Sequence, residues 1–320
     1  MSPHSQVAVV VVSYNTRNLL LECLSSVVAA THDLDIELIV VDNASEDGSY
    51  EAVRDTYPQA ITIRNPINVG FGSACNQGIT ATSAPLILLL NSDARITTEA
   101  IQSMRGCMKN NERCGAAGCR LISTSGVELS NTRNFLTPVN QALETAGIKL
   151  RSRRLRRSYE PKLDRSLVDC SVDWIDGACL MLRRAALNEI GLFDERFFMY
   201  SEDEDLCYRL GKRGWLVCYC GGGTVVHHGA ASSKQNKVEM LRQFYLSQML
   251  FLSKHRSPGS SFFYVIAMRV VLGLKKLMLR DRHRRELARE QLIALKEAWA
   301  LAEQAVSRSR PASAMGSQLG

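Results

Sequence analysis

The chain has 320 residues, of which 46% are hydrophobic and 22% charged, and its formal net charge is +7 at pH 7. This composition excludes a disordered chain and allows one sizeable core together with an appendage. The apolar run at residues 7–12 is short, follows no basic residue and runs into polar residues, so it fits neither a signal peptide nor a membrane span. We therefore expect a globular enzyme whose catalytic part stays in the cytoplasm.

Up to about residue 90, short β-branched or aliphatic runs alternate with amphipathic stretches. The predicted strands cover residues 7–12, 37–41, 61–64 and 86–90, and the predicted helices cover residues 18–30, 50–57 and 72–81. This alternation predicts a parallel α/β sheet, in which ligands bind at the carboxyl ends of the strands. Polar side chains follow all four strands, at Ser13-Tyr14-Asn15, Asp42-Asn43, residues 65–68 and Asn91-Ser92-Asp93.

Beyond residue 90, Thr97 or Thr98 is expected to cap a helix that ends at Asn110, and residues 116–122 form a further strand. The basic stretch 151–168 lacks apolar periodicity and is predicted to be a loop, with ordered structure resuming at Cys170.

After His228 the composition changes, and helical patterns cover residues 236–255, 260–280 and 282–306. We therefore divide the chain into a catalytic domain (1–232), a basic helical extension (233–306) and a disordered tail (307–320). Ten cysteines occur without a C-x-x-C pair, and thiols such as those of Cys179 and Cys207 stand among apolar residues, which indicates a reducing compartment.

Two of the motifs favour a nucleotide. A carboxylate at Asp42 can accept hydrogen bonds from a base imide or a ribose hydroxyl, although it can equally cap a turn. Gly70 and Gly72 let backbone amides approach a ligand at the start of a helix, or else form a tight turn. The segment is not the dinucleotide fingerprint, because Cys75 replaces its third glycine.

Two further motifs favour a metal and a base. Asp93 follows a buried strand, and its oxygen ligands suit Mg²⁺ or Mn²⁺, with His227 or His228 as an imidazole partner. Aromatic residues lead into four consecutive acids at 202–205, whose mutual repulsion raises their pKa values and suits a general base. The structural alternatives are a strand-end turn, a core histidine and an acidic helix N-terminus.

Seven motifs in this order resemble glycosyltransferase family 2, especially its rhamnosyltransferase-like bacterial members. They are Ser13-Tyr14-Asn15, Asp42-Asn43-Ala44-Ser45, Asn68-Val69-Gly70-Phe71, Asn91-Ser92-Asp93, Asp173-Trp174-Ile175-Asp176-Gly177-Ala178, Glu202-Asp203-Glu204-Asp205-Leu206 and His227-His228. The resemblance spans roughly residues 7 to 232. It implies a GT-A fold, with a mostly parallel central sheet flanked by helices, and inversion at the anomeric carbon.

The resemblance also implies roles for individual residues. Asp203 would be the catalytic base, and Asp93 would hold the metal with His227 or His228. The donor nucleotide would contact Ser13, Tyr14, Asn15, Asp42, Asn68, Gly70, Asn76 and Ser92. The sugar and acceptor pocket would contain Trp174, Asp176, Gly177, Glu202 and Arg209. The resemblance implies that the metal binds at a D-x-D-type motif, here Asn91-Ser92-Asp93. Asn91 departs from that motif, because it occupies the position of the first aspartate.

The function expected from the resemblance is transfer of a sugar, with L-rhamnose from dTDP-rhamnose as the leading candidate, to a saccharide acceptor that is lipid-linked, in cell-surface polysaccharide synthesis. A nucleotidyltransferase would also be α/β with acidic metal ligands, and Asn91 would suit a non-catalytic nucleotide-sugar-binding relative. Arginine clusters alone suggest nucleic acid, which we do not expect as a partner.

The helical extension contains an apolar stretch, residues 262–274, that is too short and too interrupted by Arg269 to span a bilayer. Six basic residues follow it: Lys275, Lys276, Arg280, Arg282, Arg284 and Arg285. This pattern predicts an interfacial helix on the anionic, cytoplasmic face of a membrane. The alternative is a helical hairpin that packs on the catalytic domain or on a second subunit.

Overall fold

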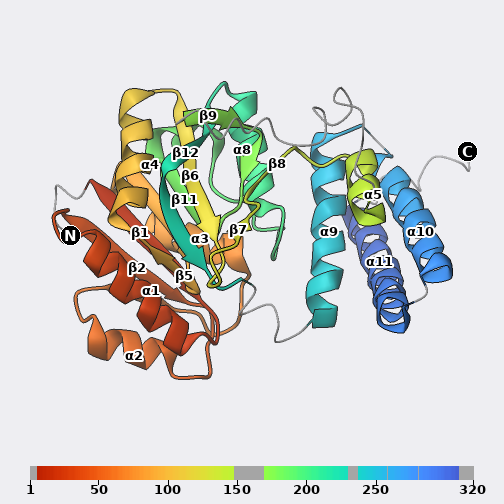
Figure 1. Cartoon of the computed structure of the whole chain (residues 1–320), viewed down its shortest axis with the longest axis horizontal. Coiled ribbons are helices and arrows are strands. Elements are labelled where there is room, and N and C mark those ends of the chain that lie inside the picture. The colour runs from red at the N-terminus through yellow and green to blue at the C-terminus, as the bar shows by residue number, and fades with distance from the viewer. Residues whose placement is uncertain (1–5, 148–168, 230–236, 258, 280, 310–320) are drawn as a thin grey trace, which may run out of the picture. The chain divides into compact units, whose positions relative to one another are not determined.

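The computed structural model describes residues 6–147, 169–229, 237–257, 259–279 and 281–309 (Figure 1). The chain forms two compact units. The sheet unit comprises Met1–Phe135 and Arg151–Gln235, and the helical unit comprises Leu136–Leu150 and Asn236–Gly320. The predicted loop 151–168 and residues 310–320 of the predicted tail lie outside the described residues.

The sheet unit contains, within its described residues, a ten-stranded sheet in the order β3-β2-β1-β4-β11-β6-β12-β5, with β7 paired to β6 and β9 to β12. Its strands are β1 (Val7–Ser13), β2 (Ile36–Asp42), β3 (Ile61–Arg64), β4 (Leu86–Asn91), β5 (Ala94–Ile96), β6 (Cys114–Ile122), β7 (Glu128–Leu129), β9 (Asp169–Val172), β11 (Cys179–Arg183) and β12 (Leu216–His227). A second, two-stranded sheet pairs β8 (Thr132–Arg133) with β10 (Trp174–Ile175).

Helices pack against the sheet because its strands are apolar on both faces. They are α1 (Arg17–Ala30), α2 (Ser49–Thr56), α3 (Phe71–Thr80), α4 (Thr98–Asn110), α7 (Arg184–Ile190) and α8 (Glu202–Lys212) (Figure 1). Alternate residues of β1 enter two separate clusters: Val9 packs in the cluster that includes residues of α1 and α4, and Val10 in the one that includes residues of α3, α7 and α8.

The parallel half of the sheet confirms the sequence prediction. β2 pairs in parallel with β1 and β3, and β1 pairs in parallel with β4. Of the two threonines proposed as the cap of the next helix, Thr97 is the one: its side chain accepts a hydrogen bond from the amide of Ala100. The rest of the sheet is mixed. β11 pairs antiparallel with β4, whereas β12 pairs in parallel with β6 and antiparallel with β5.

The helical unit consists of α5 (Pro138–Ala146), α9 (Lys237–His255), α10 (Ser260–Met278) and α11 (Arg282–Ser309). The segment 136–150 belongs to this unit although the sequence analysis places it in the catalytic domain. The physical reason lies in its contacts, since Lys275 donates to the carbonyl of Thr145 and Gln248 donates to the side chain of Gln141. Among the described helices, none is both long enough and apolar enough to cross a membrane.

Candidate active site

The carboxyl ends of β1 and β4 are joined by buried hydroxyl groups. Thr16 Oγ1 lies 3.1 Å from Ser13 Oγ and 2.8 Å from Ser92 Oγ. Asn15, in the left-handed region at φ 52°, accepts at Oδ1 from the amide of Glu46, and its own amide donates to Ser45 Oγ. These contacts fix the loops that follow the strands. Sequence reasoning did not identify Thr16, because a hydroxyl three residues past a strand is a weak signal.

Asp42 ends β2 with a side chain that is only half satisfied. The residue is 1% exposed, and its Oδ2 accepts from the amide of Ser45 at 3.1 Å. Its Oδ1 is buried and has no hydrogen-bond partner among the described residues. Since buried polar atoms are nearly always paired, this oxygen is an unusual open acceptor at the end of β2.

The glycine motif packs directly on the segment that precedes the acidic helix. Gly70 has φ 88°, and a Cβ there would lie 2.4 Å from the carbonyl oxygen of Phe198. The amide of Phe71 donates to that same carbonyl at 2.9 Å. Asn68 Oδ1 accepts from Asn43 Nδ2 at 2.8 Å and from the Gly70 amide at 3.0 Å, which holds the loop against the end of β2. The structure thus brings the glycine motif at residues 68–71 next to the segment that leads into the acidic motif at residues 202–206.

The side chain of Asp93 meets one of the two candidate histidines. His227 Nε2 lies 3.0 Å from Asp93 Oδ1, and the two side chains are 14% and 8% exposed. Burial alone would lower the pKa of His227, but the hydrogen bond and charge of Asp93 outweigh it and raise that pKa. His228 instead donates its backbone amide to the Asp93 carbonyl. A carboxylate and an imidazole are both ligand types that proteins use for divalent cations.

The acidic helix α8 begins after two residues in the left-handed region, Tyr200 and Ser201. Of its four acids, Glu202, Glu204 and Asp205 are buried, whereas Asp203 is partly exposed. Asp205 pairs with Arg209 at 2.8 Å. Asp203 is therefore the most exposed of the four acids.

Asp203 is held and tuned by the turn at residues 176–178. Its Oδ2 accepts from the amide of Gly177 at 2.8 Å. Desolvation and the charge of Asp176 raise the pKa of Asp203 to about 7. Glu202 joins them, with an Oε2 that has no partner among the described residues and a pKa raised by desolvation and by Asp203. The structure thus gathers three of the carboxylates predicted for the base and its pocket.

Other predicted site residues have their side chains engaged within the protein. Trp174 Nε1 donates to the carbonyl of Asn134. Arg209 donates to Asp205 and to the carbonyls of Ile190, Gly191 and Leu192. These contacts tie α8 to the end of α7, so the side chain of Arg209 has a structural role.

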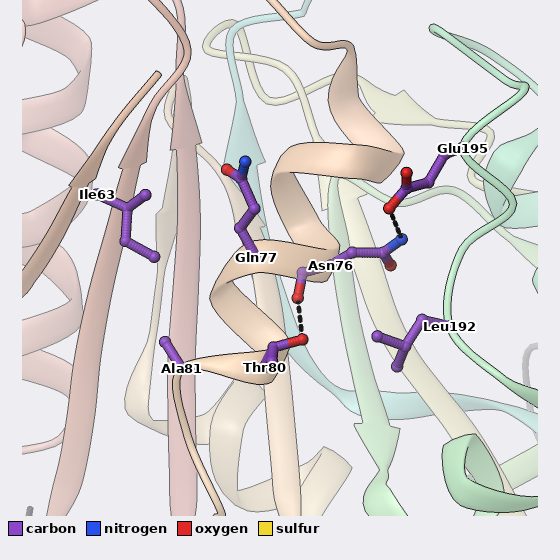
Figure 2. A pocket seen from close by; sticks show the side chains of 7 residues that line it. All are labelled: Ile63, Asn76, Gln77, Thr80, Ala81, Leu192 and Glu195. Carbon is purple, nitrogen blue, oxygen red and sulfur yellow. Dashed lines mark hydrogen bonds between the residues drawn. The ribbon is translucent and has the colours of Figure 1, made fainter. Parts of the chain in front are cut away.

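Asn76 has a similar role at a separate hollow. It exchanges hydrogen bonds with the backbone of Phe193 and donates to Glu195 Oε1. Figure 2 shows the hollow that Asn76 lines, with Ile63, Gln77, Thr80, Ala81, Leu192 and Glu195. None of Asp42, Asp93 and Asp203 lines it, so we do not place the nucleotide there.

Comparison with known proteins identifies the chain. The sequence model of the family described as Glycosyl transferase family 2 matches residues 8–191. The chain belongs to glycosyltransferase family 2. The N-acetylglucosaminyl-diphospho-decaprenol L-rhamnosyltransferase of Mycobacterium tuberculosis is 28% identical over 270 residues, which are 78% of this chain and 84% of the relative. The rhamnosyltransferase WbbL of Escherichia coli is 28% identical over 88 residues, covering 28% of this chain and 33% of that protein.

Solved structures show the same fold. The mannosyltransferase of Pyrobaculum calidifontis, in complex with GDP-Man and Mn²⁺, superposes with a TM-score of 0.59 and 14% identity over 94% of this chain and 88% of its own. GalNAc-T7 with UDP, GalNAc and Mn²⁺ gives a TM-score of 0.52 and 15% identity over 69% of this chain and 43% of its own. This chain therefore has a GT-A fold, as the resemblance implied.

Proposed function

We propose that the protein is an inverting rhamnosyltransferase that transfers L-rhamnose from dTDP-rhamnose to a lipid-linked saccharide in cell-surface polysaccharide synthesis. The rhamnosyl group and the acceptor follow the name of the Mycobacterium tuberculosis relative, which is aligned over most of both chains, and dTDP follows from the family resemblance. Transfer itself is supported above all by Asp203, a partly exposed carboxylate whose pKa is raised to about 7. A base with such a pKa can take a proton from a hydroxyl at neutral pH.

In this mechanism Asp42 binds the base or ribose through its unpaired Oδ1, and Asp93 and His227 would hold a divalent cation. When bound, the cation offsets the charge that develops on the leaving diphosphate. Asp203 accepts the proton of the acceptor hydroxyl as that oxygen attacks the anomeric carbon. Because a single displacement needs one base and no enzyme nucleophile, the anomeric configuration is inverted.

A donor panel tests the proposal. Purified full-length protein is incubated with Mn²⁺, a GlcNAc-diphospho-polyprenol acceptor, and dTDP-, UDP- or GDP-linked sugars in parallel. We expect dTDP release and an inverted rhamnosyl product with dTDP-rhamnose only. Transfer from another nucleotide sugar in place of dTDP-rhamnose would overturn the donor assignment, and absence of transfer from every donor would overturn the mechanism.

The pH profile should report the raised pKa of Asp203. Below about pH 7 the carboxylate is protonated and cannot act as a base, so kcat/KM should fall as pH decreases through that value. Since Asp176 contributes to the raised pKa of Asp203, Asp176→Asn should move this acidic limb to lower pH, while the asparagine oxygen can still accept from the Ala178 amide. The exposed Asp33→Asn is the matched control and should leave the limb in place. A limb unchanged in Asp176→Asn would contradict the assignment.

We also propose that α10 attaches the protein to the anionic, cytoplasmic face of a membrane. One side of the helix is buried in the helical unit through Tyr264, Val265, Met268 and Leu272. The other side exposes a stripe of large apolar residues: Phe262, Phe263, Ile266, Val270, Leu274, Leu277 and Met278. Arg280 lies outside the described residues and Lys275 donates to Thr145, but Lys276, Arg282, Arg284 and Arg285 are exposed. Each such charge contributes on the order of 1 kcal/mol near anionic lipid.

Vesicle flotation measures this attachment. Full-length protein should float with vesicles that contain anionic lipid and should be released by high salt, because screening weakens the basic contribution. Phe263→Glu with Leu277→Glu should abolish flotation, whereas Ile293→Glu, an exposed apolar position on α11, should not. Two results together would contradict the membrane assignment: the wild-type protein does not float, and light scattering shows a dimer that the double variant dissociates. The stripe would then be a subunit interface.

A further inference from the structure

Four buried cysteines that take no part in the proposed transfer meet on one face of the sheet. Cys107 lies on α4, Cys114 begins β6, and Cys218 and Cys220 lie on β12; all four are at most 5% exposed. The sulfur atoms of Cys107, Cys114 and Cys218 all lie within 4.8 Å of one another. Cys220 lies two residues beyond Cys218 on the same strand, in the same core cluster as the other three. Thiols that only fill core space have no need to converge from three elements.

The spacing of the sulfurs distinguishes two kinds of chemistry. Cys107 Sγ and Cys114 Sγ are 3.9 Å apart. A disulfide would bring them to about 2.05 Å. Tetrahedral coordination with metal–sulfur bonds of about 2.3 Å places neighbouring sulfurs roughly 3.8 Å apart. The separation excludes a disulfide in this structure and is compatible both with a thiol–thiol hydrogen bond and with two ligands of one tetrahedral ion.

The strand geometry brings a fourth cysteine, Cys220, into the same cluster. Residues two apart on a strand point to the same face, so Cys218 and Cys220 both direct their side chains from β12 into the core cluster that contains Cys107 and Cys114. Apart from Cys170, whose side chain the structure does not describe, the cysteines are buried and none forms a disulfide.

A positive charge lies beside the cluster. Arg183 donates from Nε to the carbonyl of Cys114 at 2.8 Å and from Nη2 to that of Asn111 at 3.1 Å. Thiolates around a divalent cation carry excess negative charge, which is costly to bury without compensation. The guanidinium group of Arg183 supplies that compensation from the backbone that carries Cys114.

We propose that Cys107, Cys114, Cys218 and Cys220 form a structural site for Zn²⁺, separate from the donor-site cation. Thiolate ligands favour Zn²⁺, whereas the Mg²⁺ and Mn²⁺ of glycosyl transfer prefer oxygen. Four protein ligands leave no open position for a substrate, which is the pattern of structural zinc. The ion would cross-link α4 to β6 and β12, and its binding energy would contribute to folding.

Metal analysis of the full-length protein tests the site. Protein purified under reducing conditions should contain about one zinc per chain. Replacing the zinc with Co²⁺ should produce thiolate-to-cobalt charge-transfer absorption and visible bands of tetrahedral cobalt. Removing zinc with a chelator should lower the melting temperature by about 5–10 °C, and Zn²⁺ should restore it.

Three variants separate this site from other sources of metal. Cys107→Ser should lose both the zinc and the cobalt charge-transfer band. Cys75→Ala, a buried cysteine in the other core cluster, and Asp93→Ala, at the donor site, should keep both. If Cys107→Ser does not fold, the cobalt titration of the wild-type protein still decides the question. Cobalt binding without a thiolate band, metal-free protein that binds no Zn²⁺, or a Cys107–Cys114 disulfide in mass spectra would each overturn the proposal.

Discussion

Asp203→Asn is expected to lower the rate of sugar transfer by about 10²–10⁴-fold, the usual contribution of a positioned base. The amide cannot take the proton of the acceptor hydroxyl. It has the size of the carboxylate and retains one oxygen to accept from the Gly177 amide. The fold should therefore persist with a small loss of stability, because the hydrogen bond that Asp203 Oδ1 accepts from the Glu204 amide is lost. Donor affinity should also persist, because Asp42, Asp93 and His227 are untouched. Initial rates at saturating donor, together with calorimetric donor binding, measure the two effects separately.

Asp205→Asn provides the contrast within the same helix turn. Asp205 is fully buried and pairs with Arg209, which in turn binds the carbonyls after α7. We therefore expect this variant to lower the melting temperature while its folded fraction keeps transfer activity. Transfer by Asp203→Asn within about tenfold of the wild-type rate would remove Asp203 as the base.

The parallel half of the fold could be predicted because β1, β2 and β4 each contain a contiguous apolar run that ends in polar residues. Val9 and Val10 pack on opposite faces, so β1 needed no alternation to be recognised as a strand. The antiparallel half could not be predicted in the same way. β5 has only three residues, and β11 pairs with partners from distant parts of the chain, which no local pattern encodes.

The site could be predicted to a similar degree. The order of the motifs predicted Asp42, Asp93 and Asp203 as site residues, but the sequence left open which of His227 and His228 faces Asp93. That choice depends on the antiparallel register of β12 against β5, which pairs His227 with Ala94. The structural role of Arg209 is hidden for the same reason, since its partners include backbone carbonyls at the end of another helix. The cysteine cluster likewise joins residues more than a hundred positions apart.

Asp93→Ala should remove the dependence of donor binding on the divalent cation. Asp93 offers a carboxylate at this strand end, where Asn91 offers only an amide. Loss of a hydrogen-bonding partner of a metal ligand costs roughly 10–100-fold in metal affinity, and loss of the ligand Asp93 itself should weaken Mn²⁺-dependent donor binding by more than that. Calorimetric titration of the donor with and without Mn²⁺ measures the change. Affinity still stimulated by Mn²⁺ to the wild-type level would refute the assignment.

Variants of the two histidines show how much each side chain contributes to cation binding at the same site. His227→Ala should reduce the Mn²⁺ stimulation less than Asp93→Ala, because a neutral imidazole only completes a shell that the carboxylate and diphosphate begin. His228→Ala is the matched control, since its backbone amide, which the substitution retains, makes the contact with Asp93. Asn91→Asp should strengthen Mn²⁺ binding, because a second carboxylate would then face the cation from the end of β4, where the Asn91 amide now lies 3.4 Å from His227 Nε2. A gain in Asn91→Asp that disappears in combination with Asp93→Ala would show that both residues bind the same ion.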